Sequence, residues 1–160
     1  MWEGGYREPG IAWWPGRIAP GGRTDALAAT YDIFPTVLRL AGAPPPPPSL
    51  TIDGIDLAPV LFGDGGKGHE CITFYWNAHA ATAADPTNLA AMRCKDHKVY
   101  WWVQCNGQGC PPAGKGINAG IQPRGRPTVF NLVKDPGESA PLLSTDPDYA
   151  PAVAAAEAAR

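Results

Sequence analysis

Five consecutive prolines, Pro44–Pro48, constrain the fold of this chain more than any other feature of its sequence. Each proline ring fixes φ at about −65° and removes the backbone N–H, so the run can join neither a helix nor the middle of a sheet. It must instead be extended, in the polyproline II conformation. A stiff spacer is the simplest role for it, and a ligand of an SH3-type domain is the alternative. We therefore predict a boundary here, with separate structures before and after it.

The segment before the prolines predicts one strand and one helix. Ile11–Trp14 is a short apolar run that ends at a Pro-Gly break, which is typical of a buried strand. Apolar residues then repeat at helical spacing in TYDIFPTVLRLAGA, so we expect a helix over Tyr31–Ala41 with its apolar face on a sheet. Thr30 or Asp32 can cap the beginning of this helix, and Gly42 suits the left-handed position after its end.

The segment after the prolines predicts a small antiparallel sheet. The run CITFYW is rich in strand-forming residues, LAAMRCKDHKVYWWV indicates a hairpin with its turn near Asp96, and TVFNLVKDPGE indicates a strand leading into an Asp-Pro-Gly turn. Two helices accompany them, a short one at about Leu57–Leu61 and a frayed, alanine-rich one from Ala150. Residues 104–127 are rich in glycine and proline and indicate a long loop. This half is therefore predicted to be an α+β module.

Charge, hydropathy and cysteine spacing exclude several classes of function. The formal net charge is −2 and no lysine or arginine block is present, so neither nucleic acid nor an anionic membrane surface is an expected partner. No stretch reaches the ~18 apolar residues of a membrane span, and the first residues lack the pattern of a signal peptide. None of the four cysteines forms a C-x-x-C pair, which argues against a zinc or thioredoxin-like site.

Five pieces of the sequence follow one another in the order of a known family. They are EGGYREPGIAWWPGRI, YDIFPTVLRLAGA, IDGIDLAPVL, KDHKVYWW, and FNLVKDPGE followed by PLL. Together they resemble the C-terminal third of a sulfatase over about Glu3–Leu143, within the group of arylsulfatase A and N-acetylgalactosamine-6-sulfatase. Each piece alone is unspecific, and their common order is what makes the resemblance.

The resemblance implies a fold and a division into domains. Residues 1–43 would be the last strand and helix of a large α/β sulfatase domain, and residues 44–48 a polyproline spacer. Residues 49–160 would be the C-terminal subdomain, a small antiparallel sheet with one or two helices. The missing N-terminal sulfatase domain would then be the partner of this chain, with Met1 an internal methionine or the edge of a truncated gene model. A secreted or lysosomal-type location is implied for the full-length protein.

The family reaction implies two cofactors that we do not expect this chain to hold. Sulfatases hydrolyse sulfate esters with a formylglycine, made from the first residue of a C/S-x-P/A-x-R motif, and with calcium held by Asp and Asn oxygens. No cysteine of this chain begins such a motif. Asp53 and Asp56 in IDGID could suggest calcium, but turn and capping roles suit them better. We therefore assign no catalytic or metal-binding residue, and we expect inactivity alone, with a sulfated small molecule or glycan as the substrate of the full-length protein.

Four residues are predicted to lie at the edge of the substrate pocket: Gly4, Gly5, His97 and Lys98. The resemblance places the glycine pair in a turn that lines the sulfate pocket, where absent side chains allow close approach of the backbone. A tight turn without ligand contact is the alternative. Relatives often carry a basic residue at the start of the hairpin arm that holds the other two, and a solvated face is the alternative there. Arg7 and Glu8 are expected to form a structural ion pair.

The cysteines and histidines complete the sequence-based expectations. Cys105 and Cys110, in CNGQGC, are the disulfide candidates: related sulfatases tie a cysteine of this loop to one upstream of the catalytic lysine, so Cys110 would either stay free or bond Cys105. Two further cysteines, Cys71 and Cys94, are expected to be buried in strands. Two histidines in loop-like sequence, His69 and His79, have no identifiable partner.

A free-standing carbohydrate-binding or interaction module is the alternative function. Its stacking platforms would be four tryptophans, Trp13, Trp14, Trp101 and Trp102. Adjacent residues of a strand point to opposite faces, so at most one of each pair can join a flat platform. Packing in a core is the better account of these side chains, and the sulfatase fragment is the first hypothesis.

Overall fold

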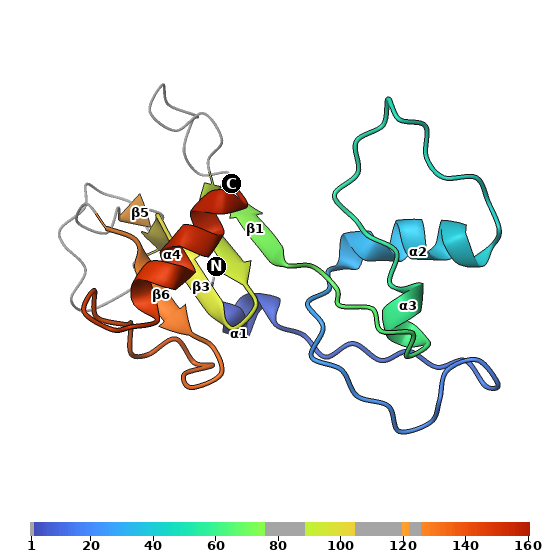
Figure 1. Cartoon of the computed structure of the whole chain (residues 1–160), viewed down its shortest axis with the longest axis horizontal. Helices are drawn as coiled ribbons and strands as arrows, with labels where there is room; N and C mark the ends of the chain where they lie inside the picture. Colours follow the sequence, from blue (N-terminus) through green and yellow to red (C-terminus); the bar gives the residue numbers. More distant parts are fainter. Residues whose placement is uncertain (1, 76–88, 105–119, 122–125) are drawn as a thin grey trace. The chain divides into compact units, whose positions relative to one another are not determined.

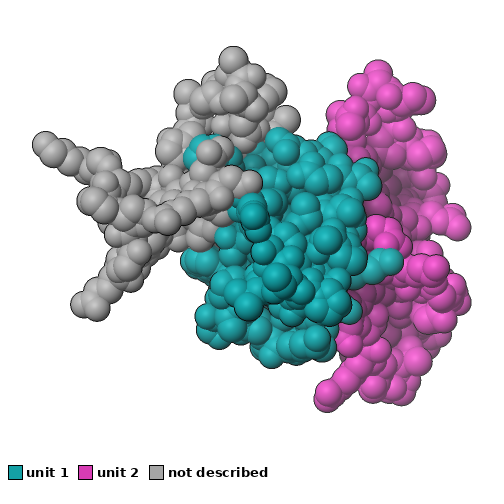
Figure 2. All heavy atoms as spheres, turned by 60° about the vertical axis from the view of Figure 1, so that its left-hand side comes forward, with its two compact units in different colours: residues 1–8, 71–160 teal, residues 9–70 magenta. Residues whose placement is uncertain are grey.

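The computed structural model describes residues 2–75, 89–104, 120–121 and 126–160, which belong to two compact units. Unit 1 combines residues 1–8 with residues 71–160, and unit 2 is residues 9–70 (Figure 2). The division expected from the sequence, at residues 43–49, concerns the domains of the full-length protein and stays a prediction. None of the helices in these described ranges has the length and apolar character of a membrane span.

Unit 1 is built on a four-stranded antiparallel sheet with the strand order β1-β2-β3-β6 (Figure 1). Its strands are β1 (Cys71–Tyr75), β2 (Leu89–Cys94), β3 (His97–Tyr100) and β6 (Thr128–Asn131). Lys95 and Asp96 form the turn between β2 and β3, and Lys95 has a φ of 52°. The predicted hairpin with its turn near Asp96 is thus confirmed, as is the strand in TVFNL. Residues 104–127 were predicted to be a long loop, but β4 (Val103–Gln104) leads into this stretch and pairs with β5 (Gly120–Ile121) inside it.

Side chains on both faces of this sheet are buried, because each face has its own cover. One face carries Met92, Val99 and Val129, which pack with alanines of the C-terminal helix α4 (Tyr149–Ala158). The other face carries Tyr100 and Phe130, which pack with Trp2 beside the single-turn helix α1 (Glu3–Tyr6). The small antiparallel sheet with helices is therefore confirmed.

The C-terminal helix is packed and not frayed as the alanine-rich sequence suggested. Ala152 and Ala156 are buried against the sheet, at 6% and 0% exposure. Methyl side chains let the helix backbone approach the strands closely, so the helix is held by tertiary packing and needs little apolar bulk.

A disulfide bond joins Cys71 to Cys94, the first residue of β1 and the last of β2. The two residues are register partners, with their Cα atoms 4.1 Å apart. Their placement in strands is confirmed, but Cys71 is only half-buried. The sequence did not suggest this bond, because 23 positions separate the pair and only strand register brings it together. The predicted candidates, Cys105 and Cys110, lie outside the described residues.

Unit 2 contains the predicted helix, as a 3-10 turn η1 (Thr30–Asp32) followed by α2 (Ile33–Leu40), and a short helix α3 (Ala58–Leu61). Oδ2 of Asp32 accepts the N–H of Ala29 at 2.6 Å and so holds the start of η1. The side-chain cap expected from Thr30 or Asp32 does not form, because neither N-cap residue, Ala29 for η1 or Asp32 for α2, makes a side-chain cap hydrogen bond. Gly42 follows the helix with a φ of 67°, as expected.

The predicted strand at Ile11–Trp14 is wrong: the structure has no strand there, and Ile11 and Trp13 are 94% and 84% exposed. The apolar face of α2 was expected on a sheet, yet Ile33, Phe34 and Val37 are each more than half exposed. A strand requires a partner that supplies hydrogen bonds and a surface that covers its side chains. Neither is present for this run among the described residues.

Candidate functional site

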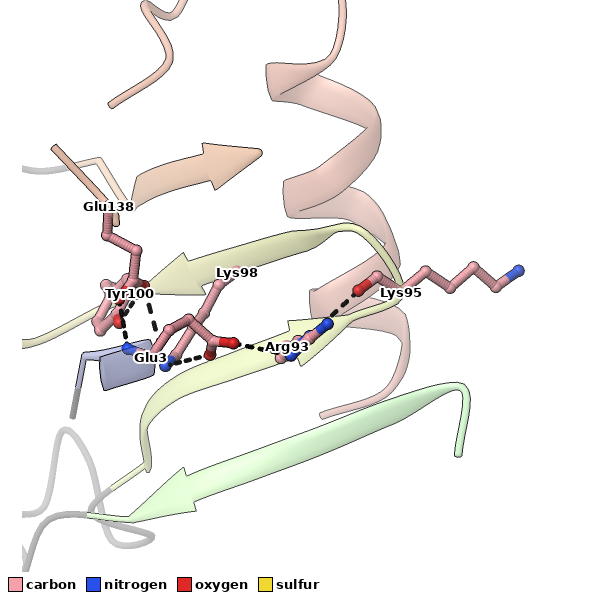
Figure 3. Close-up of polar contacts among 6 residues, drawn as sticks. All are labelled: Glu3, Arg93, Lys95, Lys98, Tyr100 and Glu138. Carbon is pink, nitrogen blue, oxygen red and sulfur yellow. Dashed lines mark hydrogen bonds and ion pairs between the residues drawn. The ribbon is translucent and has the colours of Figure 1, made fainter. Parts of the chain in front are cut away.

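A cluster of buried charged side chains joins α1 to the face of the sheet opposite α4 (Figure 3). We call it the Glu3 cluster, and its members are Glu3, Arg93, Lys98, Tyr100 and Glu138. All but Arg93 are less than 9% exposed. Charged side chains are rarely buried this far unless they are paired, so the cluster is the feature of unit 1 that most requires a physical account.

Strand register places two cations of the cluster side by side. Arg93 on β2 and Lys98 on β3 are direct cross-strand partners. Like charges in this position destabilise a sheet. The carboxylate of Glu3 lies between them: Oε1 accepts a hydrogen bond from Nζ of Lys98 at 2.9 Å, and Oε2 accepts one from Nη1 of Arg93 at 2.7 Å (Figure 3). Residues of α1 thus supply the negative charge that the sheet requires at this point.

Glu138 provides the second carboxylate, from the Asp-Pro-Gly turn after β6. The N–H of Glu138 donates to the carbonyl of Asp135 at 3.1 Å, which confirms the predicted turn. Its Oε1 accepts from the hydroxyl of Tyr100 at 2.5 Å, and its Oε2 accepts from the backbone N–H of Glu3 at 2.5 Å. Glu138 has a φ of 54°, which is uncommon for a residue other than glycine. These two buried hydrogen bonds stabilise that conformation.

Aromatic rings surround the ammonium group of Lys98. Nζ lies 4.4 Å from the ring centre of Phe74, 5.2 Å from that of Tyr100 and 5.8 Å from that of Tyr6. The negative faces of aromatic rings attract a cation, and more strongly where water is excluded. Glu3 and the rings thus enclose the lysine side chain, which at 0% exposure does not reach solvent.

The Glu3 cluster is electrically balanced and closed. Two carboxylates face two cations, and no buried side-chain nitrogen or oxygen of the described residues lacks a hydrogen-bond partner. Burial raises the pKa of the Tyr100 hydroxyl far above its usual value, and the hydrogen bond to Glu138 raises it further, so Tyr100 stays neutral. Because its charges neutralise one another, this arrangement acts as a structural connection and offers no free nucleophile or base.

The structure brings together some of the predicted pocket-edge residues and separates others. Gly4 and Gly5 lie in α1, next to Glu3, and Glu3 contacts Lys98, so these three share one region. His97 lies on the opposite face, where its Nε2 is 3.3 Å from Nδ2 of Asn131. The solvated face considered for Lys98 is wrong, because its side chain is buried. The role of all four residues at a substrate pocket stays a prediction.

The ion pair expected between Arg7 and Glu8 does not form in the structure. Both residues are exposed, and no ion pair joins these two described side chains. Exposed pairs gain little free energy, so nothing holds two adjacent, solvated side chains together. The sequence did not indicate the ion pairs that do form at this end of the chain. Glu3 makes them, with Arg93 and Lys98, which lie 90 and 95 positions later. A hairpin turn near Asp96 already implies that Arg93 faces Lys98, and this like-charge pair was the available signal.

Unit 2 has its own buried carboxylate, Asp32, at 0% exposure. Besides the N–H of Ala29, it accepts the N–H of Ile55 at 2.9 Å, and its Oδ1 lies 2.7 Å from Nε2 of His69. His69, for which the sequence offered no partner, therefore pairs with Asp32, and the ring of Tyr31 lies edge-on to it at 5.6 Å. His79 lies outside the described residues. One carboxylate thus connects three separate segments of unit 2.

The donor side chains that the structure describes do not fit a metal ion. Among the described residues, no group of three or more His, Cys, Asp and Glu side chains could hold one. The three buried carboxylates of the described residues are already occupied, since both oxygens of Asp32, of Glu3 and of Glu138 accept hydrogen bonds from the protein. Asp56 caps α3 by accepting the N–H of Ala58 at 2.8 Å, as expected. We therefore derive no chemical step through calcium here.

Two of the four candidate tryptophans, Trp101 and Trp14, contact other side chains of the described residues. Trp101 packs against the core of unit 1, its Nε1 donates to Glu157 at 2.9 Å, and the guanidinium of Arg160 lies 5.4 Å from its ring centre. In unit 2, Trp14 contacts Arg17 and Phe62. Both indole rings are thus used for packing, and the carbohydrate-binding alternative gains no support from them.

Comparison with known proteins supports one assignment over most of the chain. Residues 67–160 match the family model for the C-terminal region of aryl-sulfatase, and residues 1–43 match the family model for sulfatase. Arylsulfatase G of Rattus norvegicus is 36% identical over 151 residues, which cover 92% of this chain and 26% of the relative. Arylsulfatase A of Homo sapiens is 36% identical over 144 residues, which cover 89% of this chain and 27% of the relative. The chain spans about a quarter of the length of the curated relatives it matches.

A solved structure shares the fold as well. The PsFucS1 sulfatase from Pseudoalteromonas sp. superposes with a TM-score of 0.71 at 25% sequence identity, over 93% of this chain and 28% of that one. A curated relative with a carbohydrate substrate in its name, N-acetylgalactosamine-6-sulfatase of Canis lupus familiaris, is 35% identical over 158 residues and matches 92% of this chain and 28% of its own length.

Proposed function

Because this chain belongs to the sulfatase family, we propose that it is the C-terminal part of a sulfuric ester hydrolase that acts on aryl or carbohydrate sulfate esters. The match of residues 67–160 to the C-terminal region of aryl-sulfatase is the observation that carries this proposal. The identities of 35–36% to arylsulfatases A and G and to N-acetylgalactosamine-6-sulfatase support both substrate classes.

The proposed chemistry requires groups from elsewhere in the full-length protein. Neither a cysteine nor a serine of this chain begins a C/S-x-P/A-x-R motif. Cys110 and Ser139 both have proline at the third position, but glycine and leucine stand where the arginine is required. The formylglycine nucleophile and the calcium ion would thus be supplied by the missing N-terminal sulfatase domain. Without a nucleophile and without charge stabilisation at the sulfate, the isolated chain is expected to be inactive.

The exposed apolar side chains of unit 2 support the proposal that a further sulfatase domain packs against this chain. Ile11, Trp13, Ile33, Phe34 and Val37 are all more than half exposed. Ile33, Phe34 and Val37 are separated by one to four positions on α2, so they share one side of that helix, and a shared exposed apolar face marks a site of protein contact. Three of these side chains lie on α2, a helix within the residues that match the sulfatase family model. The rest of the large domain is the partner we propose for this surface.

The glycine pair of α1 is the part of this chain that we propose to border the substrate. A Cβ atom added to Gly4 or Gly5 would meet no heavy atom within 4 Å, so open space lies beside both backbones. A ligand can approach such a backbone closely. The disulfide in unit 1 further supports an oxidising compartment, and hence the secreted or lysosomal-type location proposed for the full-length protein.

Reading the gene upstream of the codon for Met1, and assaying the product, tests the proposal. We expect an in-frame C/S-x-P/A-x-R motif there and hydrolysis of 4-nitrophenyl sulfate by the longer product. The 160-residue chain should not exceed a buffer blank. A stop codon directly upstream would contradict the fragment hypothesis, and turnover by the 160-residue chain would contradict the assignment of the catalytic groups to the missing domain.

A further inference from the structure

The Glu3 cluster connects the two stretches of sequence that match different family models. Glu3 lies within residues 1–43, which match sulfatase, whereas Arg93, Lys98 and Glu138 lie within residues 67–160, which match the C-terminal region of aryl-sulfatase. Glu3 makes three of the contacts between these stretches. Its carboxylate forms hydrogen-bonded ion pairs with Arg93 and Lys98, and its backbone N–H donates to Glu138. All are made within unit 1, which includes residues 1–8.

We propose that the Glu3 cluster is a latch that fixes α1 on the C-terminal sheet and so determines where Gly4 and Gly5 are presented to the substrate. Glu3, Lys98, Arg93 and Glu138 are then positioning residues. The proposal rests on the proposed function only in giving the glycine pair its role. The latch itself is a property of this chain.

Charge makes the latch specific for an acidic residue in α1. The sheet alone would leave Arg93 and Lys98 opposite each other, with Lys98 at 0% exposure. A buried cation without a partner is strongly unfavourable. Glu138 does not replace Glu3, because its Oε1 lies 3.9 Å from Nζ of Lys98 and already accepts the Tyr100 hydroxyl. Glu3 is therefore the carboxylate that pairs with both the buried Lys98 and the partly exposed Arg93.

The same contacts fix the backbone of α1 as well as its side chain. The N–H of Glu3 is held by Glu138, while its carbonyl accepts the N–H of Arg7 at 2.7 Å and closes the single turn. Trp2 packs on Tyr100 and Phe130 on the N-terminal side, and Tyr6 packs on Phe74 on the other. Gly4 and Gly5 lie between these two anchors, so loss of the latch should free the glycine pair first.

The substitutions Glu3→Gln and Glu8→Gln form a matched pair for testing this. Both remove one negative charge within the same short segment, but Glu8 is exposed and makes no described contact with the sheet. Hydrogen exchange of the 160-residue chain reads out the amides of residues 3–7 and those of β2, β3 and β6 separately. A third variant, Lys98→Arg, keeps the cation and tests whether charge rather than exact shape is required.

We expect Glu3→Gln to accelerate exchange in residues 3–7 at least tenfold and in the strands less than threefold, with Glu8→Gln within twofold of the unmodified chain throughout. Lys98→Arg should stay within threefold in residues 3–7. Equal exchange in the two Glu→Gln variants would overturn the latch. Equal acceleration of α1 and the strands would show that Glu3 only supports overall stability, and would overturn its positioning role. None of these results depends on sulfatase activity.

Discussion

Unit 1 and unit 2 reach a folded state by different means. Unit 1 buries apolar side chains on both faces of its sheet and neutralises its buried charges internally. In unit 2 only Asp32, Thr36 and Ala58 are buried, and two of these three are polar. Unit 1 therefore contains its own apolar core. Unit 2 is held by hydrogen bonds instead, and apolar side chains of α2 stay exposed.

Close backbone contacts replace side-chain packing in unit 2. A Cβ atom added to Gly54 would lie 2.3 Å from the carbonyl oxygen of Tyr31, and one added to Gly68 would lie 2.4 Å from that of Leu27. The hydroxyl of Thr36 bridges two segments, because it donates to the carbonyl of Asp32 at 2.7 Å and accepts the N–H of Leu57 at 2.8 Å. Hydrogen bonds and close backbone contacts of this kind depend on exact geometry, so the loops of unit 2 tolerate few substitutions at these positions.

The largest expected effect distinguishes the two units by truncating one apolar side chain in each. Met92→Ala in unit 1 removes a side chain of 0% exposure and should lower the free energy of unfolding by about 3 kcal/mol. Val37→Ala in unit 2, at 55% exposure, should change it by less than about 0.5 kcal/mol. Urea unfolding followed by circular dichroism measures both. Equal losses would contradict the view that only unit 1 has an apolar core.

A smaller effect is expected from the buried carboxylate of unit 2. The N–H groups of Ala29 and Ile55 bond different oxygens of Asp32, so Asp32→Asn leaves them competing for one amide oxygen. Hydrogen bonds to a charged acceptor are stronger than neutral ones, so local opening of α2 should become easier by about 2 kcal/mol. Hydrogen exchange of α2 amides reports this, with the exposed Asp53→Asn as the control. Unchanged α2 exchange in Asp32→Asn would show that unit 2 is held by something else.

The smallest effect is a pH dependence confined to unit 1. The pKa of Tyr100 is raised in the folded state, so above about pH 10 the unfolded chain loses this proton and the folded chain keeps it. The stability from Tyr100 is complete below that pH and falls as pH rises, by roughly 1.4 kcal/mol per pH unit. The difference in unfolding free energy between the unmodified chain and Tyr100→Phe should therefore shrink between pH 10 and 11. A constant difference would contradict the burial of a neutral Tyr100.

The parts of the fold that were predictable from the sequence are those with a local signal. Spacing alone located the helix at Tyr31–Ala41, and turn residues located the hairpin at Asp96 and the turn before Glu138. The strand at Ile11–Trp14 failed because its apolar pattern was judged without knowing what would cover it.

The candidate site was less predictable because its contacts are long-range. Gly4 and Lys98 were singled out, but the residue that connects them, Glu3, carries no motif of its own. The pairing of Cys71 with Cys94 likewise depends on strand register, which no local pattern encodes. Sequence spacing gives the elements, whereas the partners of buried charges follow only from the way those elements pair.

The disulfide at Cys71 belongs to unit 1, but it also affects unit 2. Unit 2 ends at residue 70, so its C-terminal end leads directly into a covalently bridged residue, while its N-terminal end follows α1 and the Glu3 cluster. Residues 9–70 are thus a loop anchored at both ends. An anchored loop has fewer conformations when unfolded than a free chain of that length, and closure entropy grows only slowly with length. This smaller entropy loss explains how so few buried residues suffice to fold unit 2.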